Sequence, residues 1–402
     1  MWEGEELSND TRGNEIIHMR AIIPDKMTPA GLYVHIPFCS SRCSYCDFAT
    51  GLYQRDLADR YVRAIVEEIG ATRFVGQRVD TIYFGGGTPS LLEPAQLDRI
   101  LSSLFTHFRI EASAEITLEI NPGSATPEKL LAFRHLGINR ASFGAQTFDD
   151  AELAKLGRSH TAADALRTFA DLRDAGFTNV SFDLIAGLPG QTLAGWQRNI
   201  KQALELQPEH LSFYLLEVHS GTPLAEHIRR GLQPVPDDDL AAVMYSSLLE
   251  QAADAGYEHY EISNLCRPDF HSRHNTKYWT GQPYYGFGCS AHSYDGQTRR
   301  WSNRRDVLKY VELVESGMSP VVEEQELSQT DVRAEALFLG MRMMRGVDVR
   351  QYRELFGVDL RDEHGEDLDR FCKAGLLEFD GDLIRLTRTG ALLSNEVFAA
   401  FV

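Results

Sequence analysis

Six short apolar segments alternate with amphipathic segments along the chain from Gly31 to about Arg230. The apolar segments are residues 31–36, 79–84, 116–120, 140–145, 180–186 and 210–216. Their near-continuous hydrophobicity is typical of strands that are buried on both faces of a parallel sheet. Between the first two segments, Tyr61, Ile65 and Ile69 recur every four residues, which is the spacing of one helix face. The alternation predicts an α/β fold, a partial (β/α)6 barrel whose chemistry lies at the C-terminal ends of the strands.

The chain has 402 residues, which is long enough for a barrel and a smaller second domain. We expect an irregular leader over residues 1–30, the barrel over 31–256 and an aromatic-rich extension of the barrel over 257–316. The acidic, turn-rich residues 317–332 predict a linker. Residues 333–402 predict a small C-terminal helical, winged-helix-like domain. Its hairpin would pair Leu377–Phe379 with Leu383–Leu386 around Asp380-Gly381-Asp382.

Three closely spaced cysteines follow the first predicted strand. Cys39, Cys43 and Cys46 form a C-x3-C-x2-C run. Four thiolates would close a zinc site or bind all four irons of a 4Fe–4S cube, whereas three leave one iron for a small-molecule chelator. A zinc site is the alternative, but it would normally supply a fourth Cys or His at ligand spacing. We interpret His35, in the preceding apolar run, as a hydrogen-bonded core histidine rather than a ligand.

Glycines and one carboxylate follow the second and third predicted strands. Gly86, Gly87 and Thr88 belong to the run Gly85-Gly-Gly-Thr-Pro89, where backbone groups can approach a ligand without a Cβ in the way. A tight turn is the alternative reading of the same run. Glu119 lies near the end of the third strand, and a carboxylate there can accept both hydroxyls of a ribose. The alternative is a solvent-facing acid at a strand end.

Three further polar residues follow or interrupt later strands. Gln146 comes directly after the fourth strand, and Arg158 lies in the following segment. Arg158 can clamp a carboxylate through two hydrogen bonds or pair with a nearby acid. Asp183 stands alone within the apolar Phe182–Ile185. A carboxylate in such surroundings is expected to be paired or to face a ligand, because a buried unpaired charge is costly.

Charge and cysteine usage narrow the class of protein. With 40 basic and 58 acidic residues, the net charge is −18, which disfavours nucleic acid as a partner. The other three cysteines, Cys266, Cys289 and Cys372, are scattered, so no disulfide framework is expected. The N-terminus is acidic where a signal peptide is basic, and no apolar run approaches the roughly 18 residues of a membrane span. We therefore expect a cytoplasmic protein without an integral membrane segment.

The cysteine run, with Tyr45 before its last cysteine, resembles the signature of the radical S-adenosylmethionine (SAM) superfamily. This resemblance implies a 4Fe–4S cluster that reduces and cleaves SAM. Within the superfamily, the whole series of motifs is similar to the oxygen-independent coproporphyrinogen III oxidase family. That similarity implies that Tyr33, Gly86 and Glu119 contact the SAM at the cluster. It also implies that the residues contacting a second SAM in that family correspond to Gln146, Arg158 and Asp183.

Two features separate the chain from those oxidases. They carry a fourth cysteine two residues after the third, and Phe48 stands at that position. Residues 274–279 spell H-N-x-x-Y-W, which resembles the sister subfamily, the HemW-type haem chaperones. The resemblance implies that His274 takes part in haem binding. A hydrogen-bonded structural histidine is the alternative reading of the motif alone, and His259, His271 and His292 are alternative axial ligands in the same stretch. His offers a nitrogen to haem iron, while Tyr278 and Trp279 offer flat apolar faces to a macrocycle.

The resemblance implies haem as ligand and haem-acceptor proteins, such as respiratory ones, as partners. It also implies an electron donor such as flavodoxin or ferredoxin, and it permits a homodimer. Oxidative decarboxylation of coproporphyrinogen III is the alternative function. A radical SAM reaction on an unrelated substrate is a third, because many chemistries share this barrel.

Overall fold

A parallel core of six strands confirms the sequence prediction in this computed structural model, which describes residues 28–401. The strands lie side by side in chain order, and each neighbouring pair is parallel. They are β1 (Ala30–Ile36), β4 (Arg78–Gly86), β5 (Arg109–Ile120), β6 (Arg140–Gln146), β7 (Val180–Ala186) and β8 (His210–Leu215). Of the predicted leader, residues 1–27 lie outside the described residues, and Ala30 already begins β1.

Burial on both faces explains why these strands read as apolar runs. In β1 every residue is buried except Tyr33, and in β7 every residue is buried except Asp183. Asp183 lines the large cavity described below. The interruption of the apolar pattern in β7 therefore marks a position that faces a cavity and not the packed core.

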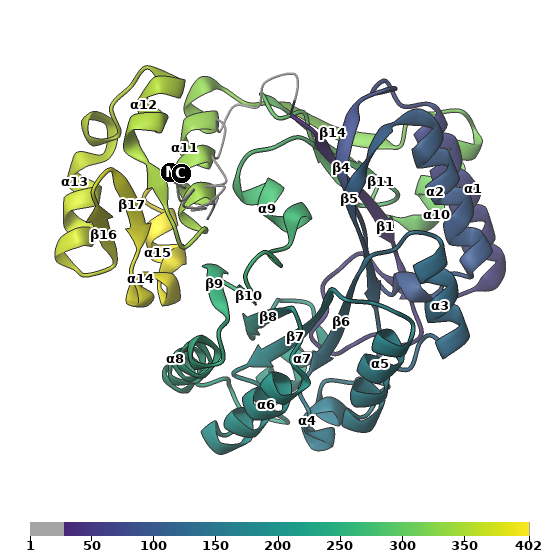
Figure 1. The fold of residues 1–402 in the computed structure, drawn as a ribbon, viewed down its shortest axis with the longest axis horizontal. Coiled ribbons are helices and arrows are strands. Elements are labelled where there is room, and N and C mark those ends of the chain that lie inside the picture. The colour runs from purple at the N-terminus through teal and green to yellow at the C-terminus, as the bar shows by residue number, and fades with distance from the viewer. Residues whose placement is uncertain (1–27, 402) are drawn as a thin grey trace, which may run out of the picture.

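Helices cover the convex face of the curved sheet (Figure 1). They are α1 (Arg55–Gly70), α2 (Pro94–His107), α3 (Pro127–His135), α4 (Asp150–Lys155), α5 (Ala162–Asp174), α6 (Leu193–Leu206) and α8 (Asp238–Asp254). Helix α1 buries Tyr61, Ile65 and Ile69, the face that their spacing predicts. Two further helices, α7 (Pro223–Arg229) and α10 (Val307–Glu315), follow β8 and the later strand β13 (Arg299–Asn303).

The sheet continues beyond the six parallel strands to twelve strands in all. At one edge β11 (Tyr284–Phe287) pairs in parallel with β1, and β12 (His292–Tyr294), β13 and β14 (Val321–Glu326) follow in antiparallel order. At the other edge β10 (Asn264–Cys266) and β9 (Glu258–Glu261) extend the sheet past β8. The aromatic-rich segment thus contributes strands to both ends of one mixed sheet.

The prediction of a linker over 317–332 is wrong. Residues 321–326 form the edge strand β14, and Gln329 already begins α11 (Gln329–Met341). The sequence carries no signal for this strand, because five of its six residues are exposed and no apolar alternation results. Its place is fixed by pairing with β13, where Arg299 forms ion pairs with Glu324 and Glu326.

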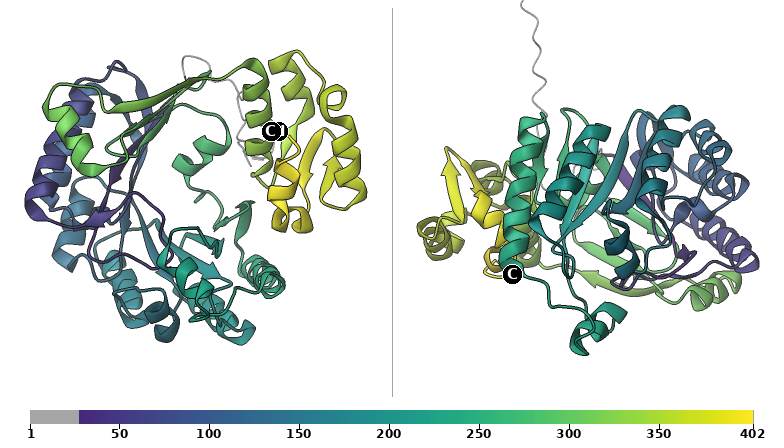
Figure 2. Two further views of the ribbon diagram at one scale, coloured as in Figure 1. Left: turned by 180° about the vertical axis from the view of Figure 1, so that it is seen from behind. Right: turned by 90° about the horizontal axis from the view of Figure 1, so that it is seen from below.

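A C-terminal domain faces the concave side of the sheet, between its two ends (Figures 1 and 2). It contains α11, α12 (Val349–Phe356), α13 (Leu360–Lys373), α14 (Arg388–Leu392) and α15 (Ser394–Phe398) around the strands β15 (Val347–Asp348), β16 (Leu377–Asp380) and β17 (Leu383–Leu386). The predicted hairpin is confirmed as β16–β17, with Gly381 at a positive φ of 62° in its turn. Tyr352, Leu360 and Leu368 belong to a separate core in this domain.

The short helix α9 (Arg273–Trp279) lies on the concave side, between the sheet and the C-terminal domain (Figure 1). The Glu115 carboxylate accepts from the backbone N–H groups of Arg273 and His274, both at 3.1 Å. Lys277 pairs with Asp80 at 2.7 Å. A carboxylate at the first turn of a helix is favourable, so these contacts fix the start of α9 against the sheet. No helix within residues 28–401 is long and apolar enough to cross a bilayer.

Candidate functional site

The cysteine loop directly follows β1 and borders a cavity of about 540 Å³. Two short strands, β2 (Phe38–Cys39) and β3 (Gly51–Leu52), pair in parallel and close the loop. The side chains of Cys39, Cys43 and Cys46 are each partly exposed, and all three line the cavity. Contiguous loop residues thus bring the three predicted thiol ligands to one wall of the cavity.

The histidine before the loop is a structural residue, as the sequence predicted. His35 is buried and donates from Nε2 to the carbonyl of Ala49, 3.0 Å away. Its Nδ1 therefore accepts from the Tyr33 hydroxyl, also at 3.0 Å. Both ring nitrogens form hydrogen bonds within the protein, so His35 stabilises the cysteine loop and is not a metal ligand.

The three cysteines are the candidate ligands of an iron–sulfur cluster at this wall of the cavity. Burial raises the pKa of Cys39 and of Cys46. Bound iron would stabilise the thiolate forms, because metal ligands must be deprotonated.

The glycine run after β4 packs against the cysteine loop. The N–H groups of Gly87 and Thr88 donate to the carbonyls of Ile36 and Phe38 at 2.8 and 2.7 Å. A Cβ at Gly87 would lie 2.7 Å from the carbonyl oxygen of Phe38, which is closer than real Cβ contacts allow, and 3.0 Å from the sulfur of Cys39. Gly86 has a positive φ of 114°, a conformation that favours glycine. The run thus forms a close-packed cradle beside the candidate cluster.

Glu119 lies at the cavity wall with both carboxylate oxygens held. Tyr83 donates its hydroxyl to Oε1 at 2.7 Å, and the N–H of Gly86 donates to Oε2 at 3.0 Å. Burial raises the pKa of Glu119 to about 7, and the nearby Asp183 adds to the shift. Each oxygen keeps a lone pair for a further donor. The side chain is thus oriented to accept hydroxyl groups from a ligand in the cavity.

Arg158 and Gln146 meet at the same wall. Arg158 donates to the sulfur of Cys43 at 3.4 Å and to the carbonyl of Gly144 at 2.8 Å. A third hydrogen bond runs to the side-chain oxygen of Asn121. Gln146 has a positive φ of 65°, which is strained for a residue with a side chain and places its amide at the cavity. The arginine is thus held by neutral acceptors and a thiol rather than neutralised by a carboxylate.

Asp183 completes this group from β7. Burial raises its pKa to about 6, while a hydrogen bond from Ser212 and the cations Arg140 and Arg158 oppose the shift. Arg140 is buried, and its Nε has no hydrogen-bond partner among residues 28–401. Asp183 thus adds a second carboxylate to a wall that also carries Glu119 and Arg158, which suits a ligand that carries both charges.

Tyr33 does not line the cavity, in contrast to the other residues that the resemblance assigned to SAM. Its hydroxyl bonds to His35, and its ring stacks on Tyr83 with centroids 6.2 Å apart. Tyr33 thus acts on the cavity through His35, which supports the cysteine loop, and through Tyr83, which holds Glu119.

The predicted haem residues lie on α9, outside this cavity. His274 is buried; its Nδ1 bonds to the Thr81 hydroxyl and its Nε2 to the Tyr278 hydroxyl, both at 2.9 Å. Burial lowers the pKa of His274 to about 3, so the imidazole is neutral. Trp279, the last residue of α9, packs against Arg342 of the C-terminal domain, whose guanidinium carbon lies 4.2 Å from the ring centroid.

Several cavity residues escaped the sequence analysis. The C-terminal domain contributes Arg342, Leu392 and Asn395, which line the cavity opposite the strands. Asn121 binds Arg158, and its place directly after β5, before a proline, was a usable signal. No local signal marks the C-terminal residues, because only the packing of the two domains brings them to the cavity.

Comparison with known proteins identifies the family to which the chain belongs. Residues 33–203 match the radical SAM superfamily, and residues 327–393 match the HemN C-terminal domain. The heme chaperones HemW of Lactococcus lactis and Bacillus subtilis are each 36% identical to this chain; the matches cover 93% and 92% of it and 97% and 98% of those proteins. The chain belongs to the HemW family. A mitochondrial relative, radical S-adenosyl methionine domain-containing protein 1 of Mus musculus, is 38% identical over 81% of this chain and 76% of its own length.

The solved coproporphyrinogen III oxidase HemN of Escherichia coli has the same architecture. The two structures superimpose with a TM-score of 0.82 at 25% identity, over 94% of this chain and 91% of HemN. The HemW family and HemN thus share both the barrel and the C-terminal domain. Membership of the radical SAM superfamily implies a 4Fe–4S cluster and SAM. The three thiols, the glycine cradle and the charged wall of this chain fit those two groups.

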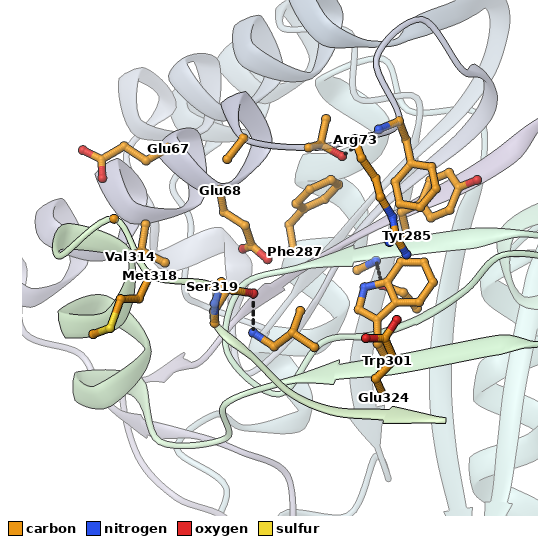
Figure 3. A pocket seen from close by; sticks show the side chains of 18 residues that line it. Glu67, Glu68, Arg73, Tyr285, Phe287, Trp301, Val314, Met318, Ser319 and Glu324 are labelled. Atoms are coloured by element: carbon orange, nitrogen blue, oxygen red, sulfur yellow. Dashed lines mark hydrogen bonds between the residues drawn. The ribbon is translucent and has the colours of Figure 1, made fainter. Parts of the chain in front are cut away.

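A second cavity of about 550 Å³ lies on the other side of the sheet and shares no lining residue with the first. Figure 3 shows Glu68 and Phe287 on one side of it, with Arg73, Tyr285 and Trp301 on the other. Burial raises the pKa of Glu68 to about 7. The Glu68 carboxylate accepts from Gly288 N–H, the Tyr310 hydroxyl and the Asn303 amide, a set of bonds that joins α1 to β13 and α10. Glu68 is thus a structural carboxylate of the HemW fold.

Proposed function

We propose that this protein is a haem chaperone, which binds haem and delivers it to haem proteins while holding a 4Fe–4S cluster and SAM. The observation that carries the proposal is Phe48. This side chain is 64% exposed at the cluster cavity, and no thiol stands there. The match to HemW proteins along more than nine tenths of the chain supports the same function.

We infer that Cys39, Cys43 and Cys46 hold the cluster and that the cavity wall holds SAM. When bound, the cluster supplies the electron for reductive cleavage of SAM. Glu119 is placed to accept the ribose hydroxyls, and Arg158 to bind a carboxylate. The other proposed SAM residues are Tyr33, Gly86, Gly87, Thr88, Gln146 and Asp183. All of these except Tyr33 line the cavity, which supports the assignment.

We propose His274 as the axial haem ligand, flanked by Tyr278 and Trp279. Neutral imidazole is the form that binds iron, and ligating histidines commonly donate their other N–H to a fixed partner. In the tautomer that donates from Nδ1 to Thr81, Nε2 carries the lone pair and accepts from Tyr278. Haem iron would replace the Tyr278 hydroxyl at Nε2, so ligation requires Tyr278 to swing away.

The proposed partners follow from this chemistry. Reduction of the cluster requires an electron donor such as flavodoxin or ferredoxin, and delivery requires haem-acceptor proteins. The six free cysteines support a reducing compartment, the cytoplasm. A homodimer is compatible with the family resemblance. Oxidative decarboxylation of coproporphyrinogen III is the second candidate, and the similarity to HemN is what favours it.

An anaerobic experiment separates the two functions. The protein with reconstituted cluster is titrated with haem, and separately incubated with coproporphyrinogen III, SAM and dithionite. We expect stoichiometric haem binding and no protoporphyrinogen. Turnover of coproporphyrinogen would restore the oxidase function. The variant Phe48→Cys serves as a comparison, since it returns a thiol to the position that oxidases occupy with cysteine.

A further inference from the structure

Two buried N–H donors next to the cluster cavity have no acceptor. They are the Nε of Arg342 and the indole Nε1 of Trp279, neither of which has a hydrogen-bond partner among residues 28–401. The two side chains touch, because the guanidinium of Arg342 lies over the Trp279 ring. Buried donors are nearly always satisfied, and an unsatisfied one carries its full desolvation cost. Oε2 of Glu261, which pairs with the other end of the guanidinium at 3.5 Å, is likewise a buried atom without a hydrogen-bond partner among residues 28–401, so the protein leaves both N–H groups unsatisfied.

Arg342 is held in place at the cavity. It follows α11, and its side chain is 25% exposed and lines the cavity that contains the cysteine loop. Its carbonyl accepts from the N–H of Ile262 at 3.1 Å. Two residues on, Met344 donates to the carbonyl of Tyr260 at 3.0 Å. These backbone bonds clamp the end of α11 to the edge of the barrel sheet and orient the guanidinium before any ligand binds.

The charge of Arg342 is only loosely matched within the protein. Within the part of the chain that the structure describes, its one ion pair is with Glu261, at 3.5 Å from Oε2. Glu261 is completely buried and uses Oε1 to accept from the Ser263 N–H and the Asn264 amide, both at 2.6 Å. Because an arginine offers five N–H donors in a planar fork, the ion pair with Glu261 leaves Arg342 further donors for a ligand.

We propose that Arg342 and Trp279 form a carboxylate subsite that binds a propionate of the tetrapyrrole. This assignment rests on the proposed haem function and names the groups that recognise the acidic edge of the ligand. A guanidinium binds a carboxylate through two parallel hydrogen bonds, and the indole N–H adds a neutral donor. The subsite joins α9, which carries the proposed iron ligand, to the C-terminal domain, so that one ligand would contact both.

Two other acceptors could bind these donors, and the test must distinguish them from a propionate. The carboxylate of SAM is one, but the candidate SAM side chains lie on the barrel strands and loops, whereas Arg342 belongs to the C-terminal domain. A water molecule between Arg342 and Glu261 is the other. Haem dimethyl ester distinguishes these cases, because esterification removes the anionic oxygens and keeps the macrocycle and the iron.

The test titrates haem, haem dimethyl ester and SAM, each alone, into the full-length protein with reconstituted cluster. The variants are Arg342→Met, Arg342→Lys and Trp279→Phe, which removes the N–H and keeps an aromatic ring. Arg353→Met is the control, since Arg353 lies in the same domain, is 62% exposed and does not line the cavity. Thermal unfolding of each variant accompanies the titrations.

We expect Arg342→Met to weaken haem binding by roughly tenfold or more, with partial recovery in Arg342→Lys and a smaller loss in Trp279→Phe. Affinity for the dimethyl ester and for SAM should stay at the wild-type value. Equal losses for haem and ester, a loss for SAM alone, or unchanged haem affinity would each overturn the subsite. Absence of haem binding by the wild type would instead refute the proposed function. Failure of the subsite and failure of the proposed function therefore give different results.

Discussion

Arg158 donates a hydrogen bond to the sulfur of Cys43, 3.4 Å away, although 115 residues separate the two in sequence. The same two loops are joined by the N–H of Ser44, which donates to the carbonyl of Leu156 at 2.9 Å. The cysteine loop therefore packs against the loop that follows α4. The contact between Cys43 and Arg158 joins the proposed cluster site to the proposed carboxylate site.

Replacement of Cys43 by serine is expected to abolish the visible iron–sulfur absorption and most of the bound iron, because a hydroxyl is a poor ligand for cluster iron. Anaerobic reconstitution followed by iron analysis and absorption spectroscopy measures both. Cys372→Ser is the matched control, since Cys372 lies on α13 and does not line the cavity. Full iron content in Cys43→Ser would refute the cluster assignment.

The affinity for SAM should rise with pH as Glu119 ionises. Burial raises the pKa of Glu119 to about 7, so the carboxylate is largely protonated at pH 6 and largely ionised at pH 8. An ionised carboxylate is the stronger acceptor for ribose hydroxyls. Calorimetric titration with SAM at pH 6, 7 and 8 measures the trend. Glu119→Gln should bind more weakly and lose most of this pH dependence; an equal slope in the variant would assign it to another group, such as Asp183.

Glu68 should make folding stability fall as pH rises. Its pKa is raised by burial to about 7, above the ordinary value of 4.5, so the folded state binds more protons than the unfolded state between these values. Stability then declines with increasing pH over that window. Urea unfolding from pH 5 to 8 should show a shallower decline for Glu68→Gln than for the wild type. The control is Glu67→Gln, because Glu67 is the exposed neighbour on α1.

Removal of the Tyr278 hydroxyl separates a ligand role of His274 from a structural one. In Tyr278→Phe, Nε2 of His274 loses its hydrogen-bond partner while the Thr81 contact remains. If Nε2 binds haem iron, this variant should bind haem at least as tightly as the wild type. His274→Ala should bind haem more weakly and be less stable by about 2 kcal/mol, since two buried hydrogen bonds are lost. Absorption titration with haem and chemical unfolding measure the two effects.

The sequence predicted most of the barrel because its signals are local. Each core strand is a contiguous apolar run, and the helix periodicity of α1 falls within one segment. The edge strand β14 was missed for the opposite reason. Its residues face solvent, and only pairing with β13 gives it a strand conformation.

The candidate site also contains residues that a local sequence signal indicates and contacts that only the tertiary structure forms. Cys39, Cys43 and Cys46 lie within eight residues, and a fixed spacing in one loop is enough to bring them to one wall. Glu119 and Asp183 stand out in the sequence because each interrupts or ends an apolar strand, and both line the cavity. His274 is singled out by its motif, but its hydrogen bonds to Thr81 and Tyr278 depend on how α9 packs against β4.

The sequence by itself determined the cysteine spacing, the order of the barrel strands and the loss of a thiol at Phe48, because these are properties of short contiguous segments. Only the tertiary structure decided that Arg158 reaches Cys43 and that Tyr33 stays outside the cavity. It also brought Arg342 against Trp279. Such contacts join segments far apart in the chain, and they form only when the sheet curves and the C-terminal domain packs against its concave side.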